Sequence, residues 1–310
     1  MTGKIVVIGS SNADFIMKME RLPRVGETVT DALFMQTFGG KGANQAVGAA
    51  RAGGEVIFVN CVGDDLYGRL IKDNLRAAGV NVECVFEETG VASGAALVLV
   101  GGEGKNMIAV APGANYRLTP AYIDRVRGVI AEAEMVVMQY EILPETLRYA
   151  VETCAQLGKR VVLNLAPARP IGSETLARLF ALVVNETEAE FLVGYPVDTP
   201  ERARQAAQDL LKMGPQWAIL TLGAHGLHAA SRETCFDVPA FRVQAVDTTA
   251  AGDIFCGSLA AALVEGRPMP EALRFASAAA AISVTRLGAQ PSAPARAEIE
   301  ALLAQGGQTG

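Results

Sequence analysis

The sequence has little of what disulfide frameworks, zinc sites and nucleic-acid-binding surfaces require. Five cysteines are scattered among 310 residues and none forms a CxxC pair, so neither a disulfide framework nor a zinc site is expected. No basic run is present and the formal net charge is −6, which argues against nucleic acid or an anionic membrane as a partner. An anionic substrate would therefore need local positive charge from helix N-termini, a metal ion or a few placed cations.

Long apolar segments are also missing. The richest, Ala276–Val284, is too short and contains too much serine to span a bilayer, so it is interpreted as a core helix. Met1–Lys4 leads directly into the short apolar run Ile5–Ile8, and no secretory signal is expected. A cytoplasmic location is the resulting expectation. The two histidines, His225 and His228, have no third ligand at metal spacing and are expected to be exposed loop residues.

Half of the residues are apolar, enough for one large core or two modest ones. A single α/β domain spanning residues 1–310 is the expectation. From about residue 120, apolar runs typical of buried strands alternate with helical segments. The expected strands are Met135–Gln139, Val161–Leu165, Ala181–Asn185 and Ala218–Leu222, and the expected helices are Pro144–Leu157, Glu186–Leu192 and Pro200–Met213. This order predicts a doubly wound, mostly parallel sheet flanked by helices, with ligands at the carboxyl ends of its strands.

The first 115 residues follow a different pattern, since their β-like segments are broken by turns rather than by helices. These segments are Phe15–Met19, Thr28–Phe38 and Gly94–Val110, and GGEG at Gly101–Gly104 has the composition of a hairpin turn. We expect a small separate β-sheet built from two distant stretches of chain, about 12–40 and 92–112.

The run DTTAAGD at Asp247–Asp253 precedes a helical pattern in which apolar residues recur at spacing four. Ala250, Ala251 and Gly252 leave their backbone amides accessible, so a helix start here can form an anion hole. Asp253 in the first turn can accept a proton from a hydroxyl in line with a transferring phosphate. A purely structural explanation, with Asp247 capping the turn and Asp253 complementing the helix dipole, has equal weight for this run alone.

A glycine-rich run, GGKGAN at Gly39–Asn44, opens a second helical pattern. Its glycines permit close backbone approach to a ligand, and Lys41 and Asn44 supply polar contacts. The GxxxxGK spacing is absent and no Ser or Thr follows the lysine, so it is not a P-loop. A glycine turn with a solvated lysine would explain the same residues.

Isolated polar residues also follow the expected strands. Asn12 and Asp14 can bracket neighbouring sugar hydroxyls, or form an Asx turn. Glu141 stands just beyond the strand at 135–139, where it is either a ligand or an ordinary acid at a helix start. Asn185 with Glu188 fits a capping box without any ligand, and TLGAHG at Thr221–Gly226 makes a turn that does not by itself require a nucleotide.

Taken together, these runs resemble the ribokinase group of the PfkB carbohydrate kinase family. GSSNAD, FGGKGANQAV, NETEAE, TLGAHG and AVDTTAAGDIF occur in the family's order and spacing, together with GETVT at Gly26–Thr30 and GAQPS at Gly288–Ser292. The resemblance covers essentially the whole chain. It implies transfer of the γ-phosphate of ATP to a small sugar, and a lid formed by the two β-like stretches that also makes a homodimer interface.

The resemblance also implies roles for individual residues. Asp253 is the implied base, and Ala250, Ala251 and Gly252 form the implied anion hole. The implied sugar-binding residues, besides Asp253, are Asn12, Asp14, Gly40, Lys41, Gly42, Ala43, Asn44 and Glu141. The implied ATP-binding residues are Asn185, Thr221, Leu222, Gly223, Ala224, His225, Gly226, Gly252 and Ser277, the last in place of a histidine found in some relatives.

Two kinds of cation are implied as well. Mg²⁺ is expected to arrive with the nucleotide rather than in a protein cage. A potassium ion beside the anion hole would be held, mostly through backbone oxygen, by Asp247, Thr249, Ser283, Arg286, Gly288 and Ser292.

The resemblance therefore implies a kinase that phosphorylates D-ribose at O5. The same reaction on 2-deoxyribose or fructose is the alternative. A nicotinamide dehydrogenase is disfavoured because GxGxxG does not follow the first strand. A non-catalytic sugar-binding protein would not need Asp253.

Overall fold

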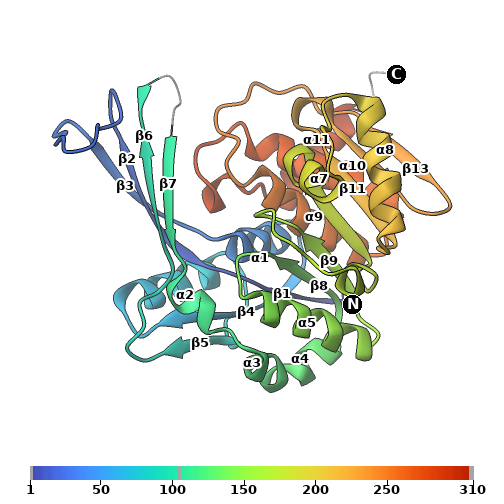
Figure 1. Cartoon of the computed structure of the whole chain (residues 1–310), viewed down its shortest axis with the longest axis horizontal. Coiled ribbons are helices and arrows are strands. Elements are labelled where there is room, and N and C mark those ends of the chain that lie inside the picture. Colours follow the sequence, from blue (N-terminus) through green and yellow to red (C-terminus); the bar gives the residue numbers. More distant parts are fainter. Residues whose placement is uncertain (1–2, 103–105, 307–310) are drawn as a thin grey trace.

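The computed structural model describes residues 3–102 and 106–306 and is dominated by one large sheet (Figure 1). Within these residues the sheet has nine strands. In spatial order they are β13 (Cys235–Val238), β12 (Leu227–Ala230), β11 (Trp217–Thr221), β10 (Ala181–Asn185), β9 (Arg160–Asn164), β8 (Ala133–Gln139), β1 (Lys4–Ile8), β4 (Glu55–Gly63) and β5 (Val85–Glu88). The strands from β11 to β5 are parallel, and β12 and β13 form an antiparallel edge. The predicted mostly parallel sheet is confirmed.

Helices cover both faces of this sheet, as the nearly apolar strands require. One face packs against α1 (Lys41–Arg51), α2 (Leu66–Ala77), α9 (Ala251–Val264), α10 (Met269–Ser283) and α11 (Arg296–Gly306). The other packs against α3 (Pro120–Arg125), α4 (Arg127–Glu132), α5 (Pro144–Gln156), α6 (Ser173–Leu176), α7 (Glu186–Val193) and α8 (Pro200–Lys212). Three short 3₁₀ turns in the described chain are η2 (Gly113–Arg117), η3 (Gly223–His225) and η4 (Gln290–Ser292).

Strand β1 illustrates how the two cores arise. Ile5 and Val7 belong to the core on the α9 side, whereas Val6 and Ile8 belong to the core on the α5 side. Because successive side chains of a strand point to opposite faces, an apolar run such as this one contributes to both cores.

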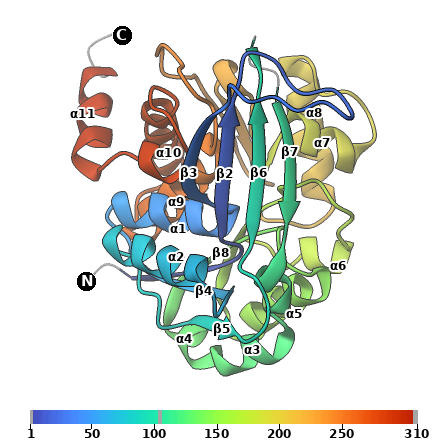
Figure 2. The same cartoon turned by 90° about the vertical axis from the view of Figure 1, so that its left-hand side faces the viewer.

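A second, smaller sheet stands apart from the main one (Figure 1), and its strands lie side by side in Figure 2. Its order is β3 (Leu33–Gly39), β2 (Asn12–Lys18), β6 (Ala95–Val100) and β7 (Asn106–Ala111). The expected small sheet from two distant stretches is therefore confirmed, although β3 begins only at Leu33, and 28–32 has no regular structure. The arms of the expected hairpin, β6 and β7, pair antiparallel, and its GGEG turn falls partly on 103–105, outside the described residues.

The strand predictions at 135–139, 161–165, 181–185 and 218–222 match β8 to β11 within two residues at each end. The prediction that His228 is an exposed loop residue is wrong. It lies on β12, is 3% exposed, and its Nδ1 is 2.8 Å from Oδ1 of Asp237. The antiparallel pairing of β12 with β11 and β13 buries it. Within residues 3–102 and 106–306, no helix combines the length and apolarity needed to cross a membrane.

Candidate active site

Several of the polar residues singled out above come together at the carboxyl edge of the main sheet. Ser10 follows β1, while β8 and β9 end at Gln139 and Asn164. Strands β10 and β11 end side by side, with Asn185 paired to Thr221. Parallel strands bring such residues to one edge, where ligands of open α/β sheets bind.

Helices α1 and α9 approach each other closely above this edge. A Cβ at Gly257 would lie 2.2 Å from the backbone oxygen of Gln45, and a Cβ at Gly48 would lie 3.2 Å from Cα of Ile254. Glycine at these positions therefore lets the two helix backbones pack against each other. Residues at the start of α1 reach the first turn of α9 for this reason.

The carboxylate of Asp253 lies at that meeting point and is 5% exposed. Oδ1 accepts a hydrogen bond from Nε2 of Gln45 and Oδ2 accepts one from Nδ2 of Asn44, both at 3.0 Å. Burial raises the pKa of Asp253, and Lys41 and these two amides oppose that rise. One acidic group is thus held in a fixed orientation in a largely desolvated position.

The turn that leads into α9 is strained. Ala250 is the N-cap and has φ of 60°, and in the described part of the chain it is the one non-glycine residue with positive φ. The amide of Ala251 donates to the carbonyl of Thr248 at 3.3 Å. Gly252 is exposed and a Cβ there would meet nothing within 4 Å, so the helix start is open on that side.

Lys41, the first residue of α1, is the cation that lowers the pKa of Asp253. Asp253 raises the pKa of Lys41, burial lowers it, and Glu141 and Glu188 raise it further, with a net rise. Lys41 therefore remains a cation among three carboxyl groups. Such a local positive charge is what an anionic substrate needs on a chain of net charge −6.

Asp14 and Glu141 form an acidic pair near the lysine. Burial, with a further contribution from Glu141, raises the pKa of Asp14 to about 7. Glu141 accepts hydrogen bonds from the hydroxyl of Ser10 and from the backbone amide of Lys41. A Cβ at Gly39 would lie 2.1 Å from Oδ2 of Asp14, so glycine is needed there for Asp14 to adopt this position.

The other residues of the predicted sugar site are tied into the backbone. Asn12 is buried and its Oδ1 accepts from Nδ2 of Asn115 at 2.9 Å. Gly40 has φ of 86°, and a Cβ at Gly42 would lie 2.6 Å from the backbone nitrogen of Ser10. Ala43 is buried, and its amide donates to the carbonyl of Ser10 at 2.8 Å. These contacts fix GGKGAN against the end of β1.

Four buried side-chain atoms of the described residues have no hydrogen-bond partner: Oδ1 of Asp14, Oδ1 of Asn44, Oε1 of Gln139 and Oγ of Ser258. The first two belong to the predicted sugar site. Buried polar atoms without a partner are rare, because leaving one unsatisfied costs about 1–3 kcal/mol. Hydroxyl groups of a bound ligand would satisfy both atoms.

The predicted nucleotide segment lies at the ends of the next two strands of the sheet, β10 and β11. Asn185 and Glu188 form the expected capping box at the start of α7, and this prediction is confirmed. The loop 221–226 contains η3 and has positive φ at Gly223 and Gly226. Leu222 is the N-cap of η3, and Ala224 and His225 lie within it. Ser277 is half-buried on α10, and no hydrogen bond among the described residues joins it to this loop.

In the predicted cation site, the Asp247 carboxylate joins the segment 247–249 to the segment 283–292. Oδ1 of Asp247 accepts from the amide of Thr249 at 2.9 Å, and Oδ2 accepts from the amide of Gly288 at 2.9 Å. Burial raises the pKa of Asp247, but a hydrogen bond from the Thr249 hydroxyl to Oδ1 and the bonds from these two amides outweigh burial, and the net shift is downward. Elsewhere in this segment the carbonyl of Ser283 accepts from the amide of Arg286 at 3.0 Å, and Ser292 is fully buried.

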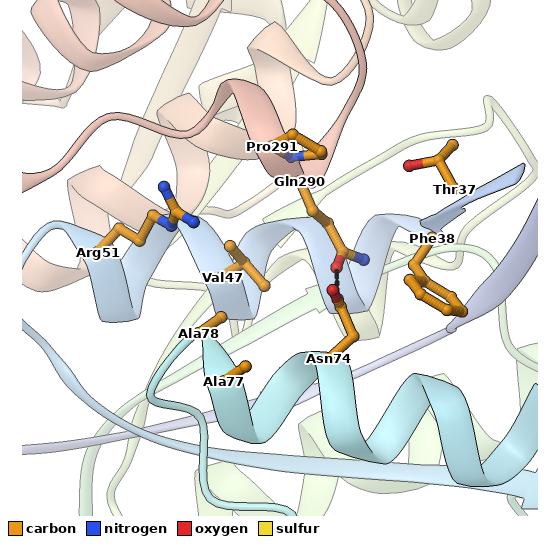
Figure 3. Close-up of a pocket in the computed structure, with 9 residues that line it drawn as sticks. All are labelled: Thr37, Phe38, Val47, Arg51, Asn74, Ala77, Ala78, Gln290 and Pro291. Atoms are coloured by element: carbon orange, nitrogen blue, oxygen red, sulfur yellow. Dashed lines mark hydrogen bonds between the residues drawn. The ribbon is translucent and has the colours of Figure 1, made fainter. Parts of the chain in front are cut away.

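Beside this segment lies a cavity between α1, α2, the end of β3 and η4 (Figure 3). None of the residues lining it was predicted as a site residue. Gln290 spans it, since its side chain accepts from Asn74 and donates to the carbonyl of Gly39 at 3.4 Å. Gln290 thereby connects the segment 288–292 to the strand that precedes GGKGAN.

Three buried amides near Asp253 were not predicted from the sequence. They are Gln45 and Gln139, both 0% exposed, and Asn164, which is 6% exposed. The available signal was a polar residue in an otherwise apolar context, at the ends of two predicted strands and inside a predicted helix. Such residues need buried partners, and these three have one another.

Comparison with known proteins agrees with this arrangement. Residues 2–296 match the pfkB family carbohydrate kinases. Ribokinase of Bacillus subtilis (strain 168) is 41% identical over 301 residues, covering 96% of this chain and 99% of the relative. Deoxyribokinase of Salmonella typhi is 38% identical, covering 94% and 95%. The structure of Arabidopsis thaliana ribokinase complexed with ribose and ATP superposes with a TM-score of 0.93 at 34% identity, covering 98% and 99%.

These matches extend over nearly the whole chain and over nearly the whole length of each relative. The chain therefore belongs to the pfkB family of carbohydrate kinases. It is a kinase of the ribokinase type, as the sequence predicted.

Proposed function

We propose that this protein transfers the γ-phosphate of ATP to O5 of D-ribose, giving ribose 5-phosphate, with Asp253 as the general base. The observation that carries the proposal is the buried Asp253 carboxylate, which Asn44 and Gln45 orient at the N-terminus of α9. A base there can take the hydroxyl proton while the amides at the helix start stabilise the transferring phosphoryl group.

The sugar would be held between β1 and α1. The free acceptors on Asp14 and Asn44 can each receive a sugar hydroxyl, and Glu141 and Lys41 lie in the same charge cluster. Asn12 and Gly40–Ala43 would contribute mainly by fixing the shape of this site. The ribose complex of the Arabidopsis relative supports the same class of substrate.

Another small sugar, 2-deoxyribose or fructose, is the alternative. Deoxyribokinase of Salmonella typhi is nearly as similar to this chain as ribokinase of Bacillus subtilis, at 38% against 41% identity. The unpaired oxygen of Asp14 favours ribose, because a site that binds a hydroxyl group rejects an analogue without it.

ATP would lie along the ends of β10 and β11, beside Asn185, residues 221–226 and Ser277, with its phosphates directed to Gly252. The adjacent strand ends support this placement. Mg²⁺ would enter with the nucleotide and neutralise charge on the β- and γ-phosphates.

Potassium fits the segment around Asp247. Its half-buried carboxylate lacks a salt-bridge partner in the described residues, and the amide of Gly288 ties it to the segment 283–292. The backbone oxygens of Thr249, Ser283, Arg286 and Gly288, together with Ser292, would supply the remaining ligands. A hard monovalent cation prefers such oxygen ligands and would offset this charge beside ATP.

The small sheet would act as a lid on a single domain spanning residues 1–310. Its two stretches, about 12–40 and 92–112, begin beside the sugar-binding residues, and Asn12 and Gly39 pair directly in β2 and β3. Closure over the sugar would exclude water, which otherwise competes for the phosphoryl group.

The same sheet would form a homodimer interface. Met17, Phe34, Leu97 and Met107 are between 37% and 58% exposed. By strand register all four lie on the face opposite to Asp14. An apolar face of this kind favours association with a second copy.

A cytoplasmic location is proposed because the five cysteines are free thiols. Cys61, Cys84, Cys154 and Cys256 are buried free thiols, and Cys235 is an exposed one. Free thiols persist in a reducing compartment.

The experiment that tests the proposed base is the variant Asp253→Asn. Turnover with ATP and D-ribose should fall by about 10²- to 10⁴-fold, while the ribose dissociation constant changes little. Turnover equal to that of the unmodified protein would remove Asp253 from this role.

A further inference from the structure

We infer that Gln45 is a positioning residue for Asp253 and that Gln139 fixes the orientation of Gln45. The inference rests on the proposed role of Asp253 as the base that accepts the sugar proton. It concerns two residues that are fully buried and so act through Asp253 rather than on the sugar itself.

A continuous line of hydrogen bonds leads from the main sheet to the base. Nε2 of Gln139, at the end of β8, donates to Oε1 of Gln45 at 2.7 Å. Nε2 of Gln45, on α1, donates to Oδ1 of Asp253 at 3.0 Å and lies 3.2 Å from Oδ1 of Asn164 at the end of β9. Elements from four separate parts of the chain thus converge on one carboxylate.

The direction of these bonds is set by chemistry. An ionised carboxylate only accepts hydrogen bonds, so the NH₂ group of Gln45 must face Asp253. That places the carbonyl oxygen of Gln45 on the other side, where it needs a donor, and Gln139 supplies one. Without Gln139, the Gln45 amide would lose the hydrogen bond that keeps its NH₂ group directed at Asp253.

Gln45 and Asn44 hold different oxygens of Asp253 and so have different tasks. Asn44 donates to Oδ2 and keeps a free Oδ1, which is available for a sugar hydroxyl. Gln45 has both ends of its amide engaged within the protein. Binding of a sugar would therefore change the contacts of Asn44 while Gln45 keeps the carboxylate in place.

Loss of the Gln45 donor has a predictable effect on ionisation. A hydrogen bond to the charged form lowers the pKa of a carboxyl group, and its removal raises that pKa. The charged or titratable groups around Asp253 are Lys41, Glu141, Glu188 and Cys256. They stay in place in a Gln45 variant, so a shift between the two pH profiles reports the lost donor.

The test uses the full-length variants Gln45→Met and Gln139→Met, which keep side-chain volume and remove the amide. For Gln45→Met we expect kcat at pH 7 to fall by about ten-fold or more. The acidic limb of the pH–kcat profile should move up by about one pH unit, with the ribose dissociation constant unchanged. Gln139→Met should move the limb in the same direction by less, and add nothing to Gln45→Met in the double variant.

The control is Thr146→Val on α5. This substitution removes a buried hydrogen bond from the hydroxyl of Thr146 to the carbonyl of Leu118. Thermal unfolding of every variant separates lost stability from lost positioning. The control should lower stability without moving the pH limb.

Asp253→Asn, measured in parallel, separates the two claims. A Gln45→Met protein that is folded and keeps the original pH limb and kcat, beside an inactive Asp253→Asn, overturns the inference and leaves the proposed base intact. Full activity of Asp253→Asn would overturn the proposed base itself. Additive effects of the two methionine substitutions would overturn the claim that Gln139 acts through Gln45.

Discussion

Nδ2 of Asn44 donates a hydrogen bond to Oδ2 of Asp253 at 3.0 Å, although 209 residues separate them in the sequence. The contact joins the start of α1 to the first turn of α9, and glycines at the crossing of these helices make it possible. The runs GGKGAN and DTTAAGD thereby belong to one site. The proposed base on α9 is therefore held by residues of the run proposed to bind the sugar.

The acidity of Asp14 gives a prediction for sugar binding. Its pKa is raised to about 7, so lowering the pH through that value protonates the carboxylate that would accept a sugar hydroxyl. The ribose dissociation constant should therefore rise as pH falls from 8 to 5.5. Calorimetric titration at several pH values measures it, and Asp14→Asn should bind weakly with little pH dependence. A flat profile for the unmodified protein would contradict this role.

The same shift predicts how stability depends on pH. Between the ordinary value of 3.8 and about 7, folded Asp14 retains a proton that the unfolded chain has released. Its contribution to the free energy of unfolding therefore falls as pH rises through that window. The free energy of unfolding of Asp14→Asn minus that of the unmodified protein should therefore be larger at pH 8 than at pH 4, by more than about 1 kcal/mol. Urea unfolding at both pH values tests this, and an equal difference at both would contradict it.

Gly42→Ala should create a steric clash between the start of α1 and the residues that follow β1. Its Cβ would lie 2.6 Å from the backbone nitrogen of Ser10, and backbone cannot move as cheaply as a side chain. We expect a loss of about 1–3 kcal/mol in the free energy of unfolding and a higher KM for ribose.

Gly128→Ala is the matched control, because it also occupies the second residue of a helix and its Cβ would meet nothing within 4 Å. It should be neutral or stabilising by up to about 1 kcal/mol. Equal unfolding energies for the two variants would contradict the steric account.

Potassium should activate the enzyme through Asp247. Replacing it with tetramethylammonium, which cannot enter a site of close oxygen ligands, is expected to lower turnover several-fold. In Asp247→Asn the carboxylate charge is lost, so turnover should be low and insensitive to the cation. Steady-state assays at constant ionic strength measure both. Activity indifferent to the cation in the unmodified protein would remove the cation site and leave the rest of the account intact.

Association through the small sheet should depend on its apolar outer face. Phe34→Glu introduces a charge at a residue that is 58% exposed and should yield a monomer in sedimentation equilibrium. Leu287→Glu is the control, because Leu287 is 68% exposed and lies outside the small sheet. Two monomeric proteins, or two unchanged dimers, would contradict the proposed interface.

Much of the architecture was predictable because the strands of the main sheet are short, apolar and separated by helical patterns. The strands β8 to β11 were predicted within two residues at each end for this reason. The edge strands β12 and β13 are only four residues each, and their pairing depends on tertiary contacts, so His228 was misplaced.

The candidate site was predictable where residues follow strands or open helices, as Asp253, Asn44 and Glu141 do. Gln45 and Gln139 were not, because their roles depend on a meeting of α1, β8 and α9 that local sequence does not encode. The strained φ of Ala250 was likewise invisible, since alanine normally avoids that conformation.

The most direct test is the rate of ADP release with D-ribose, 2-deoxyribose and fructose under saturating MgATP and potassium. The account predicts that kcat/KM for D-ribose exceeds that for 2-deoxyribose by up to ~10⁴-fold, because Asp14 would lose its hydroxyl partner. Comparable kcat/KM values for D-ribose and 2-deoxyribose would contradict the assignment to ribose, and no turnover of any sugar would contradict the account as a whole.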